Sequence, residues 1–502
     1  MRKALMTGAA LMFAATAAAA PPRDTIMLSS LAKLGTVDER FQSYNIEMVE
    51  VTGGRFWAPY GGPAAEMYRM RPPADLADPR LRHLARHLGP VYLRVSGTWA
   101  NTTYLPAEGE SLSSPPEGYK QILTRDQWRG VVAYSKAVGA KIVTSFAAGD
   151  GTRGSDGVWK PDQAQRLIDL TRSAGGAIYG AEFFNEPNIP MHGGLPKGYG
   201  TADFIRDFGV FRDWAKRAAP DMEIIGYGGV SEGSMMKASP QTASRGFLST
   251  EDFMKANPGA LDIVAYHFYG GVSQRCGGAG EVKKDVALTP GWLDRTLLDQ
   301  AHYGNLRDRY EPGKPLWLNE TAQAACGGSP WAASFLDSFR YLNQLGLLAQ
   351  KGVQSVQHNT LAASDYGLID GDTLAPRPNY WAALLWTKNM GATVLASPAS
   401  PSPDMRIYAH CLKGGKGGVG LVAINTGSAP QNLFFGKTGK VWVMNAASVD
   451  SMTISINGKS PAIDAKGRLS GLDGATAKGS ISLPGQTIGF VAVAGANNTA
   501  CR

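Results

Sequence analysis

The sequence is short of charged residues, histidine and cysteine for its length of 502 residues. Charged residues make up only 18% of the chain, and its four cysteines form no Cys-x-x-Cys spacing, so neither a zinc site nor a dithiol redox motif is expected. The net charge is +8, but Lys and Arg form no block of about five or six residues. This pattern gives little support for sequence-specific binding of nucleic acid.

Long hydrophobic runs are absent after the first segment, and no later stretch approaches the roughly 18 consecutive apolar residues that a membrane-spanning helix needs. The first segment begins with Arg2-Lys3 and continues as an Ala-rich stretch that includes Ala17-Ala18-Ala19. A charged start, a short apolar centre and small residues at the end are typical of a secretory signal peptide; a membrane anchor is the alternative. We therefore expect cleavage near residue 19, no membrane attachment afterwards, and a secreted or periplasmic protein.

Between residues 44 and 361 the sequence alternates apolar runs with amphipathic segments. The apolar runs are Tyr44–Val51, Val91–Gly97, Lys141–Ala147, Ala177–Asn185, Glu223–Gly229, Leu261–Tyr269, Pro315–Glu320 and Val353–Leu361. The helix-like segments are Leu81–Leu88, Asp126–Val138, Pro161–Ala174, Asp203–Ala219 and Trp331–Lys351. Buried strands separated by helices indicate an α/β fold with a parallel sheet, and eight of them favour a closed (β/α)8 TIM barrel over a doubly wound open sheet. The active site of such a barrel lies at the C-terminal ends of its strands.

The helical pattern stops near Met390. The short alternating segments that follow are Met405–Leu412, Gly418–Asn425, Lys440–Met444, Met452–Ile456 and Thr487–Val493. They predict a β-sandwich, and Asp24–Thr36 is a candidate for one more of its strands. The predicted organisation is a signal peptide (1–19), an N-terminal segment (20–43), a catalytic barrel (44–390) and a C-terminal β-sandwich (391–502).

The four cysteines allow two disulfides in an oxidising compartment, with three possible pairings. Cys276 and Cys326 follow the sixth and seventh predicted strands, and neighbouring loops of a barrel lie side by side. Cys411 and Cys501 both belong to the predicted β-sandwich. We therefore expect the pairs Cys276–Cys326 and Cys411–Cys501.

Two glutamates stand at matched ends of predicted barrel strands. Glu186 follows the fourth run within Asn185-Glu186-Pro187, and Glu320 ends the seventh run. Glycosidic cleavage uses two carboxyl groups on either side of one bond, one protonated and one ionised, and in retaining enzymes they lie about 5–5.5 Å apart. The sequence therefore predicts a glycoside hydrolase without metal or cofactor. Glu182 lies deeper on the same strand and is expected to form an ion pair inside the barrel.

Several short segments occur in a fixed order. They are Tyr92–Thr98, Phe184–Asn188, His267–Tyr269, Asn319–Thr321, Asp365–Leu368 and Pro378–Trp381. Together they resemble glycoside hydrolase family 79, the heparanase and β-glucuronidase family, from about residue 44 to residue 398. The resemblance implies a retaining enzyme that cleaves β-D-glucuronosyl linkages, with Glu186 as acid/base and Glu320 as nucleophile.

The resemblance also implies the residues that contact the sugar. Asn185 is expected to hydrogen-bond the 2-hydroxyl, and Tyr269 is expected to orient the nucleophile, with His267 beside it. Glu47 and Thr98 are expected to line the subsite.

The glucuronate carboxylate is expected to be held by Tyr366 and by backbone amides around Gly327 and Gly328. The stretch before these glycines, Ala324–Cys326, departs from heparanase, which has an aromatic residue there. The long linker that heparanase loses after its first barrel strand is also missing, so a single-chain enzyme is expected. The motifs do not separate endo from exo action.

Other sequence features offer alternatives. Gly229–Gly233 matches the Gly-x-Ser-x-Gly pattern of a serine esterase with Ser231 as nucleophile and His267 or His302 as base, although a loop of the barrel explains it better. His83 and His87 stand four residues apart, as metal ligands on a helix do, but no third ligand is nearby and solvated histidines are favoured. His358 ends the eighth run, where it either touches substrate or fills the barrel mouth.

The expected partner is a glucuronide or a saccharide that contains glucuronic acid, bound by a monomer. Another barrel β-glycosidase with an Asn-Glu-Pro motif and a non-catalytic polysaccharide-binding protein are the remaining alternatives.

Overall fold

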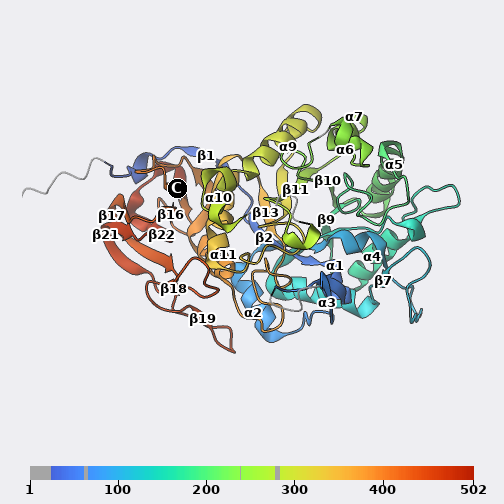
Figure 1. Ribbon diagram of the computed structural model, residues 1–502, viewed down its shortest axis with the longest axis horizontal. Coiled ribbons are helices and arrows are strands. Elements are labelled where there is room, and N and C mark those ends of the chain that lie inside the picture. Colours follow the sequence, from blue (N-terminus) through green and yellow to red (C-terminus); the bar gives the residue numbers. More distant parts are fainter. Residues whose placement is uncertain (1–23, 61–65, 238, 278–282) are drawn as a thin grey trace, which may run out of the picture.

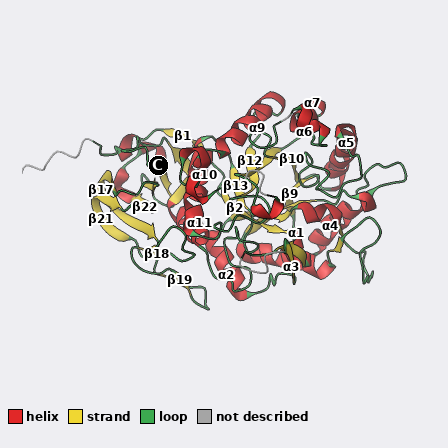
Figure 2. Cartoon of the chain, in the orientation of Figure 1, coloured by secondary structure: helices red, strands yellow, loops and turns green. Residues whose placement is uncertain are grey.

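The computed structural model describes residues 24–60, 66–237, 239–277 and 283–502. The predicted signal peptide lies outside these residues. In Figure 1 a barrel ringed by helices occupies the right and centre, and an antiparallel β domain lies at the left; Figure 2 gives the same view by secondary structure.

Eight parallel strands close into a barrel, as the sequence predicted. In barrel order they are β2 (Gln42–Glu47), β5 (Val91–Ser96), β8 (Ala140–Ser145), β9 (Ile178–Glu182), β10 (Glu223–Val230), β11 (Ile263–Tyr269), β12 (Leu316–Ala322) and β13 (Ser355–His358). Each of the predicted apolar runs overlaps one of them, and pairing of β13 with β2 closes the barrel. The fold class is confirmed: a TIM barrel followed by an antiparallel β domain.

The helices around the barrel follow from amphipathic patterns and end signals. They include α2 (Pro79–Leu88), α3 (Arg125–Val138), α4 (Asp162–Ser173), α5 (Thr201–Ala218), α9 (Thr296–Tyr310), α10 (Phe335–Gln350) and α11 (Pro378–Asn389). For example, Asp78 caps α2 by accepting a hydrogen bond from the amide of Leu81, and Pro79 occupies its first turn. The sequence did not predict α11, because it is buried on nearly every side and lacks an amphipathic period.

The first predicted run, Tyr44–Val51, is a strand only as far as Glu47. Met48–Thr52 forms helix α1 instead, although this segment is rich in apolar and β-branched residues. The amide of Glu47 donates to Glu50 Oε2 at 2.7 Å, which fixes the helix start. As a result, the Glu47 side chain stands at the tip of the first barrel strand.

The barrel interior has an apolar lower layer and a polar upper layer. Alternate residues of a strand face the same way, so Tyr92 and Arg94 of β5 both point inward. Tyr92 packs in the lower layer against Trp317, with ring centroids 4.3 Å apart, whereas Arg94 lies one step nearer the C-terminal ends. The polar layer therefore rests on a packed floor.

The β domain is one antiparallel sheet with two buried faces. Its strands are β14 (Met390–Leu395), β15 (Met405–Leu412), β16 (Val419–Asn425), β17 (Gln431–Asn445), β18 (Ser455–Ile456), β21 (Ala475–Leu483) and β22 (Thr487–Val493). Tyr408, Val422 and Phe490 join the core of the barrel helices, while Leu421 and Val491 belong to a second core. Strand β21 was missed because its exposed face is small and polar.

The segment before the barrel also belongs to this sheet, since β1 (Lys33–Thr36) pairs antiparallel with β14. The division of the chain into a catalytic barrel at 44–390 and a β domain at 391–502 remains a prediction. None of the helices in the described part of the chain combines the length and the apolar character that crossing a membrane would require.

The two disulfides join the predicted pairs. Cys276 is bonded to Cys326 between neighbouring barrel loops, and Cys411 is bonded to Cys501 within the β domain. The first bridge holds the loop that follows β12, and the second holds the C-terminal segment against β15.

We predict that replacing Cys411 and Cys501 by serine lowers thermal stability more than activity, because the bridge closes a chain segment of 90 residues far from the barrel mouth. Loss of such a bridge costs roughly 2–5 kcal/mol. Replacing Cys276 and Cys326 is the matched control and should affect catalysis more than the melting temperature. Calorimetry together with an activity assay at low temperature checks both variants, and equal losses of activity would contradict the prediction.

Candidate active site

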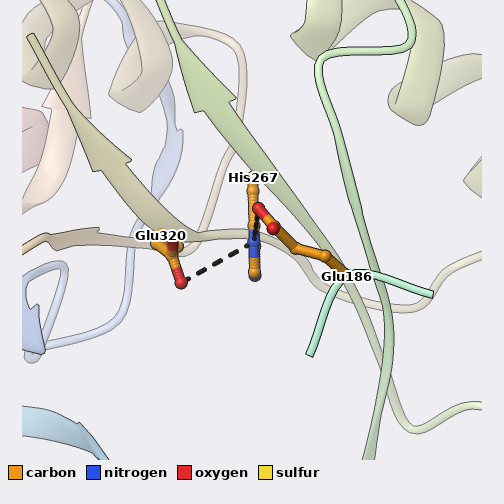
Figure 3. Close-up of side chains that lie close together, drawn as sticks. All are labelled: Glu186, His267 and Glu320. Atoms are coloured by element: carbon orange, nitrogen blue, oxygen red, sulfur yellow. Dashed lines mark hydrogen bonds and ion pairs between the residues drawn. The ribbon is translucent and has the colours of Figure 1, made fainter. Parts of the chain in front are cut away.

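Three side chains meet at the C-terminal mouth of the barrel. Glu186 follows β9, His267 lies on β11 and Glu320 lies on β12, and they face one another in Figure 3. One carboxylate oxygen of each glutamate and one ring nitrogen of His267 all lie within 4.8 Å of one another. The two glutamates that the sequence selected are thus brought together.

Local irregularities in the backbone set the orientation of Glu320 and Glu186. The register of β12 against β11 steps from Leu318 to Glu320, so Asn319 is an extra residue in the ladder. This bulge lets the Asn319 and Glu320 side chains both face the barrel interior, which strict alternation does not allow. Glu186 has a left-handed backbone with φ of 52°, which is uncommon for a residue other than glycine.

Arg94 is the central cation of the site and is almost completely buried, with 1% of its surface exposed. Its guanidinium donates from Nη1 to Glu320 Oε2 at 2.6 Å and from Nε to Glu182 Oε2 at 2.9 Å. It also donates from Nη2 to Asn185 Oδ1 at 2.8 Å. Arg94 therefore binds three of the side chains that the sequence analysis identified, including the deep ion-pair partner Glu182.

His267 lies between carboxylates. Its Nδ1 is 3.1 Å from Glu186 Oε1 and 3.7 Å from Glu320 Oε2, and its Nε2 is 3.5 Å from Glu182 Oε1. Burial and the nearby Arg94 lower the pKa of His267, but the surrounding carboxylates outweigh them and raise it to about 9. The carboxylates around it therefore favour the protonated imidazole.

The glutamates of the site differ in their affinity for a proton. Burial raises the pKa of Glu320, but His267, Arg94 and a hydrogen bond from Tyr269 outweigh burial and bring it below the usual 4.5. For Glu186, burial is the largest effect and the charge of Glu320 adds to it, so its pKa is raised. The site thus favours one ionised and one protonated carboxyl, which is the arrangement that acid/base chemistry at a glycosidic bond needs.

The same balance extends to the deeper glutamates. Burial raises the pKa of Glu182, but Arg94 and His267 lower it to about 2. Burial and the charge of Glu320 raise the pKa of Glu47 well above 4.5. Arg94 and His267 therefore compensate the carboxylates of Glu182 and Glu320. The carboxyls of Glu186 and Glu47 favour the neutral form.

Asn359 links the other expected subsite residues. Its Nδ2 lies 2.9 Å from Glu47 Oε1, 3.1 Å from Tyr269 Oη and 3.2 Å from Tyr366 Oη. Tyr269 donates to Glu320 Oε1 at 2.7 Å, so the residue expected to orient the nucleophile is in contact with it.

Gly97 and Thr98 lie directly beside Glu47. A Cβ atom on Gly97 would be only 1.6 Å from Glu47 Oε2, and Gly97 has φ of 93°, so this position requires glycine. Glu47 Oε2 is buried and has no hydrogen-bond partner. Thr98 follows Gly97 and begins a short helical turn.

The loop after β12 carries the expected carboxylate-binding amides. Gly327 and Gly328 have φ of 82° and 87°, and Gly328 packs against the Tyr366 ring. Arg275 donates to the carbonyls of Cys326 and Gly328 and forms an ion pair with Asp365. This network and the Cys276–Cys326 bridge hold the loop in place.

Asn101 positions the Asn-Glu-Pro segment. It accepts from the amide of Asn185 at 2.9 Å and donates to the Asn185 carbonyl at 3.0 Å. Asn185, Tyr269 and Glu320 are thus all held by partners that the sequence analysis did not single out. Arg94, Asn101, Asn319 and Asn359 had one detectable signal, a polar residue in or directly after an apolar strand.

The alternative sites find no support. Ser231 is fully buried, and its Oγ has no hydrogen-bond partner among the described residues, while His267 is engaged by carboxylates. His302 lies 3.9 Å from Glu232 and does not reach Ser231 within hydrogen-bonding distance.

The remaining histidines have structural surroundings. His87 Nε2 lies 2.8 Å from the Gly467 carbonyl, and His83 also packs on Gly467. His358 Nε2 lies 2.7 Å from the Tyr366 carbonyl, and burial lowers its pKa to about 3, so a neutral His358 supports the Tyr366 loop.

Glu186, His267 and Glu320 are the residues whose spacing resembles that of metal ligands within the described part of the chain. They fit a metal ion poorly, because His267 favours the protonated form and Arg94 already occupies one oxygen of Glu320.

Comparison with known proteins relates the chain to heparanases and glucuronidases. No family model matches the chain. The chain is 26% identical to heparanase from Mus musculus over 98% of this chain and 97% of that protein, and 24% identical to hyaluronoglucuronidase from Hirudo nipponia over 85% and 92%. The resemblance to glycoside hydrolase family 79 is confirmed.

A solved structure confirms the fold alone. The 4-O-α-L-rhamnosyl-β-D-glucuronidase from Fusarium oxysporum has a TM-score of 0.62 at 12% identity, covering 94% of this chain and 99% of that chain.

We predict that Arg94→Met destabilises the protein by about 3–5 kcal/mol near pH 7, because it leaves buried carboxylates without their partner. Without Arg94 the pKa of Glu182 rises from about 2. A carboxyl whose pKa is raised in the folded state favours folding at low pH, so the loss of melting temperature should shrink as the pH falls toward about 5.

The control Arg94→Lys keeps the positive charge, and its melting temperature should differ from wild type by a similar amount at each pH. Melting curves of both variants across this pH range test the prediction. A loss for Arg94→Met that does not change with pH would contradict it.

Proposed function

We propose that this chain is a retaining glycoside hydrolase that cleaves β-D-glucuronosyl linkages, with Glu320 as nucleophile and Glu186 as acid/base. The observation that carries the proposal is the pair of carboxyls at the ends of β9 and β12, with oxygens within 4.8 Å of each other and pKa values shifted in opposite directions. This separation favours retention, for which about 5–5.5 Å is typical, over inversion, for which about 6.5–9.5 Å is typical.

In the first step, Glu320 forms a bond to the anomeric carbon while the bond to the leaving oxygen breaks. Glu186 gives its proton to that oxygen, so the leaving group departs as a neutral alcohol. In the second step, the ionised Glu186 takes a proton from water, and the water oxygen displaces Glu320 from the anomeric carbon. Two displacements at one carbon retain its configuration.

The surrounding side chains prepare both steps. Arg94 and Tyr269 each donate to one oxygen of Glu320, which keeps the nucleophile ionised and fixes its orientation. The charge on His267 stabilises both carboxylates, including the one left on Glu186 after proton transfer. Asn185, held by Arg94 and Asn101, is placed to bond the 2-hydroxyl of the sugar.

The acidic sugar is supported by the relatives and by the loops around Tyr366. The matched proteins include a heparanase and a hyaluronoglucuronidase, and their names describe action on glucuronic-acid-containing saccharides or glucuronides. The Tyr366 hydroxyl and the amides of Gly327 and Gly328 are proposed to hold the glucuronate carboxylate. We further propose export of the protein, cleavage of its signal peptide and action as a monomer without cofactor.

The roles of the two glutamates predict different responses to leaving-group quality. Glu320→Gln should abolish turnover, because a neutral amide does not attack the anomeric carbon. Glu186→Gln should lower kcat/KM by about 10²–10⁴-fold for alkyl glucuronides, whose oxygen needs a proton, but spare kcat/KM for activated aryl glucuronides. Steady-state kinetics on both substrate types test this, and an equal loss on both would remove Glu186 from the acid role.

Selection for the carboxylate predicts a large difference between sugars. An aryl glucuronide should react with a kcat/KM at least about 10²-fold above the corresponding glucoside, since the glucoside leaves polar groups of the site without partners. Tyr366→Phe should narrow this ratio, whereas Tyr227→Phe, at a buried tyrosine of β10 that packs on Phe204 and Phe208, is the control and should preserve it. Similar rates on the two sugars in the wild-type enzyme would refute carboxylate recognition.

A further inference from the structure

The leaving-group side of the site is bordered by two loops that are bonded together. Glu186 protonates the leaving oxygen, so the group that departs lies on its side of the barrel mouth. The loop that starts at Glu186 contains Asn188, whose Oδ1 accepts from the Val230 amide at 3.0 Å and whose carbonyl accepts from the Leu248 amide at 2.9 Å. The loop after β10, described at residues 231–237 and 239–248, therefore lies next to the Glu186 loop.

These two loops carry a cluster of methionines and a phenylalanine. The leaving-group surface, as we call it, consists of Met191, Met235, Met236 and Phe247. Met235, Met236 and Phe247 are partly buried and pack on an apolar cluster that contains Ile189 and Tyr269. Tyr269 donates to the Glu320 carboxylate, and the Ile189 amide donates to the main-chain carbonyl of Glu186, so this cluster contacts both segments that carry the two glutamates.

Backbone contacts place the four side chains together. The amides of Met235 and Met236 both donate to the Ser231 carbonyl, at 3.0 and 2.8 Å, so the chain turns directly after β10. A Cβ atom on Gly246 would lie 3.1 Å from Met191 Cε, which puts Met191 beside Phe247. Met191 is 44% exposed, and Met235, Met236 and Phe247 are partly exposed beside it.

We infer that this surface is a binding subsite for an apolar aglycone, such as the alkyl or aryl part of a glucuronide; the inference rests on the proposed function. Methionine adapts its shape and contacts rings and aliphatic chains alike, which suits apolar groups of varied form. Lys237 and Arg245 flank the surface and are both exposed. These two positive charges favour a different ligand, an anionic saccharide. The side chains nearer the carboxyls are apolar, however, and favour an apolar aglycone.

A series of alkyl β-D-glucuronides with methyl, butyl, hexyl and phenylethyl groups tests the inference, because their leaving-group acidity is similar while their apolar area increases. kcat/KM should rise by about two- to fourfold per buried methylene. The double variant Met235→Gln with Met236→Gln keeps side-chain size but adds polarity, and it should bring the hexyl-to-methyl ratio close to one. The control Met452→Gln, at an exposed residue of the β domain, should leave that ratio at its wild-type value.

Different failures identify different errors. If the wild type cleaves all alkyl glucuronides equally, or prefers hyaluronan or heparan oligosaccharides with a ratio that the double variant does not alter, the apolar subsite is refuted while glucuronide hydrolysis stands. If no glucuronide of any kind is cleaved by the folded protein, the proposed function itself is wrong and the inference falls with it.

Discussion

The buried ion pair network around Arg94 is the interaction on which the rest of the site depends. One guanidinium joins Glu182, Asn185 and Glu320, which come from three different segments of the chain. A buried carboxylate is unstable unless a cation or donor compensates it. Because Arg94 and the charged His267 compensate only two carboxylates, the other two glutamates favour the neutral form. The proposed division of Glu186 and Glu320 into acid and nucleophile therefore rests on the charge balance of the whole cluster.

Positioning of this cluster relies on departures from ideal strands. A bulge at Asn319 turns Glu320 inward, Glu186 has a left-handed backbone, and Gly97 leaves room for Glu47. Such local strain persists where the surroundings define the structure strongly. Here the packed lower layer of the barrel supplies that support from below. Above it, the Cys276–Cys326 bridge and the Arg275–Asp365 ion pair connect the loops.

Much of the fold was predictable because periodicity is a local property. The eight barrel strands and five of the helices could be located from apolar patterns alone, and the motif residues 185–187 and 319–321 pointed to the catalytic pair. Helix α11 was not predicted, because it is buried on nearly every side and has no amphipathic period. Strand β21 was not predicted, because its exposed residues are small and polar. The contacts of Arg94 with Glu182 and of Asn359 with Tyr269 were not predicted, since each joins residues more than 80 positions apart and depends on how the barrel closes.

The pairing of β1 with β14 has a consequence for the order in which the protein can assemble. Strand β1 is synthesised early, but its partner β14 is more than 350 residues further along the chain. The carbonyls of Leu28 and Leu31 likewise accept hydrogen bonds from Asn498, which is synthesised near the end. Barrel strand β2 must also wait for β13 before the barrel closes. During synthesis neither unit can therefore complete its sheet until most of the chain has emerged. Contacts of such long sequence separation are slow to form, so a nascent chain of this protein keeps open strand edges for most of its synthesis.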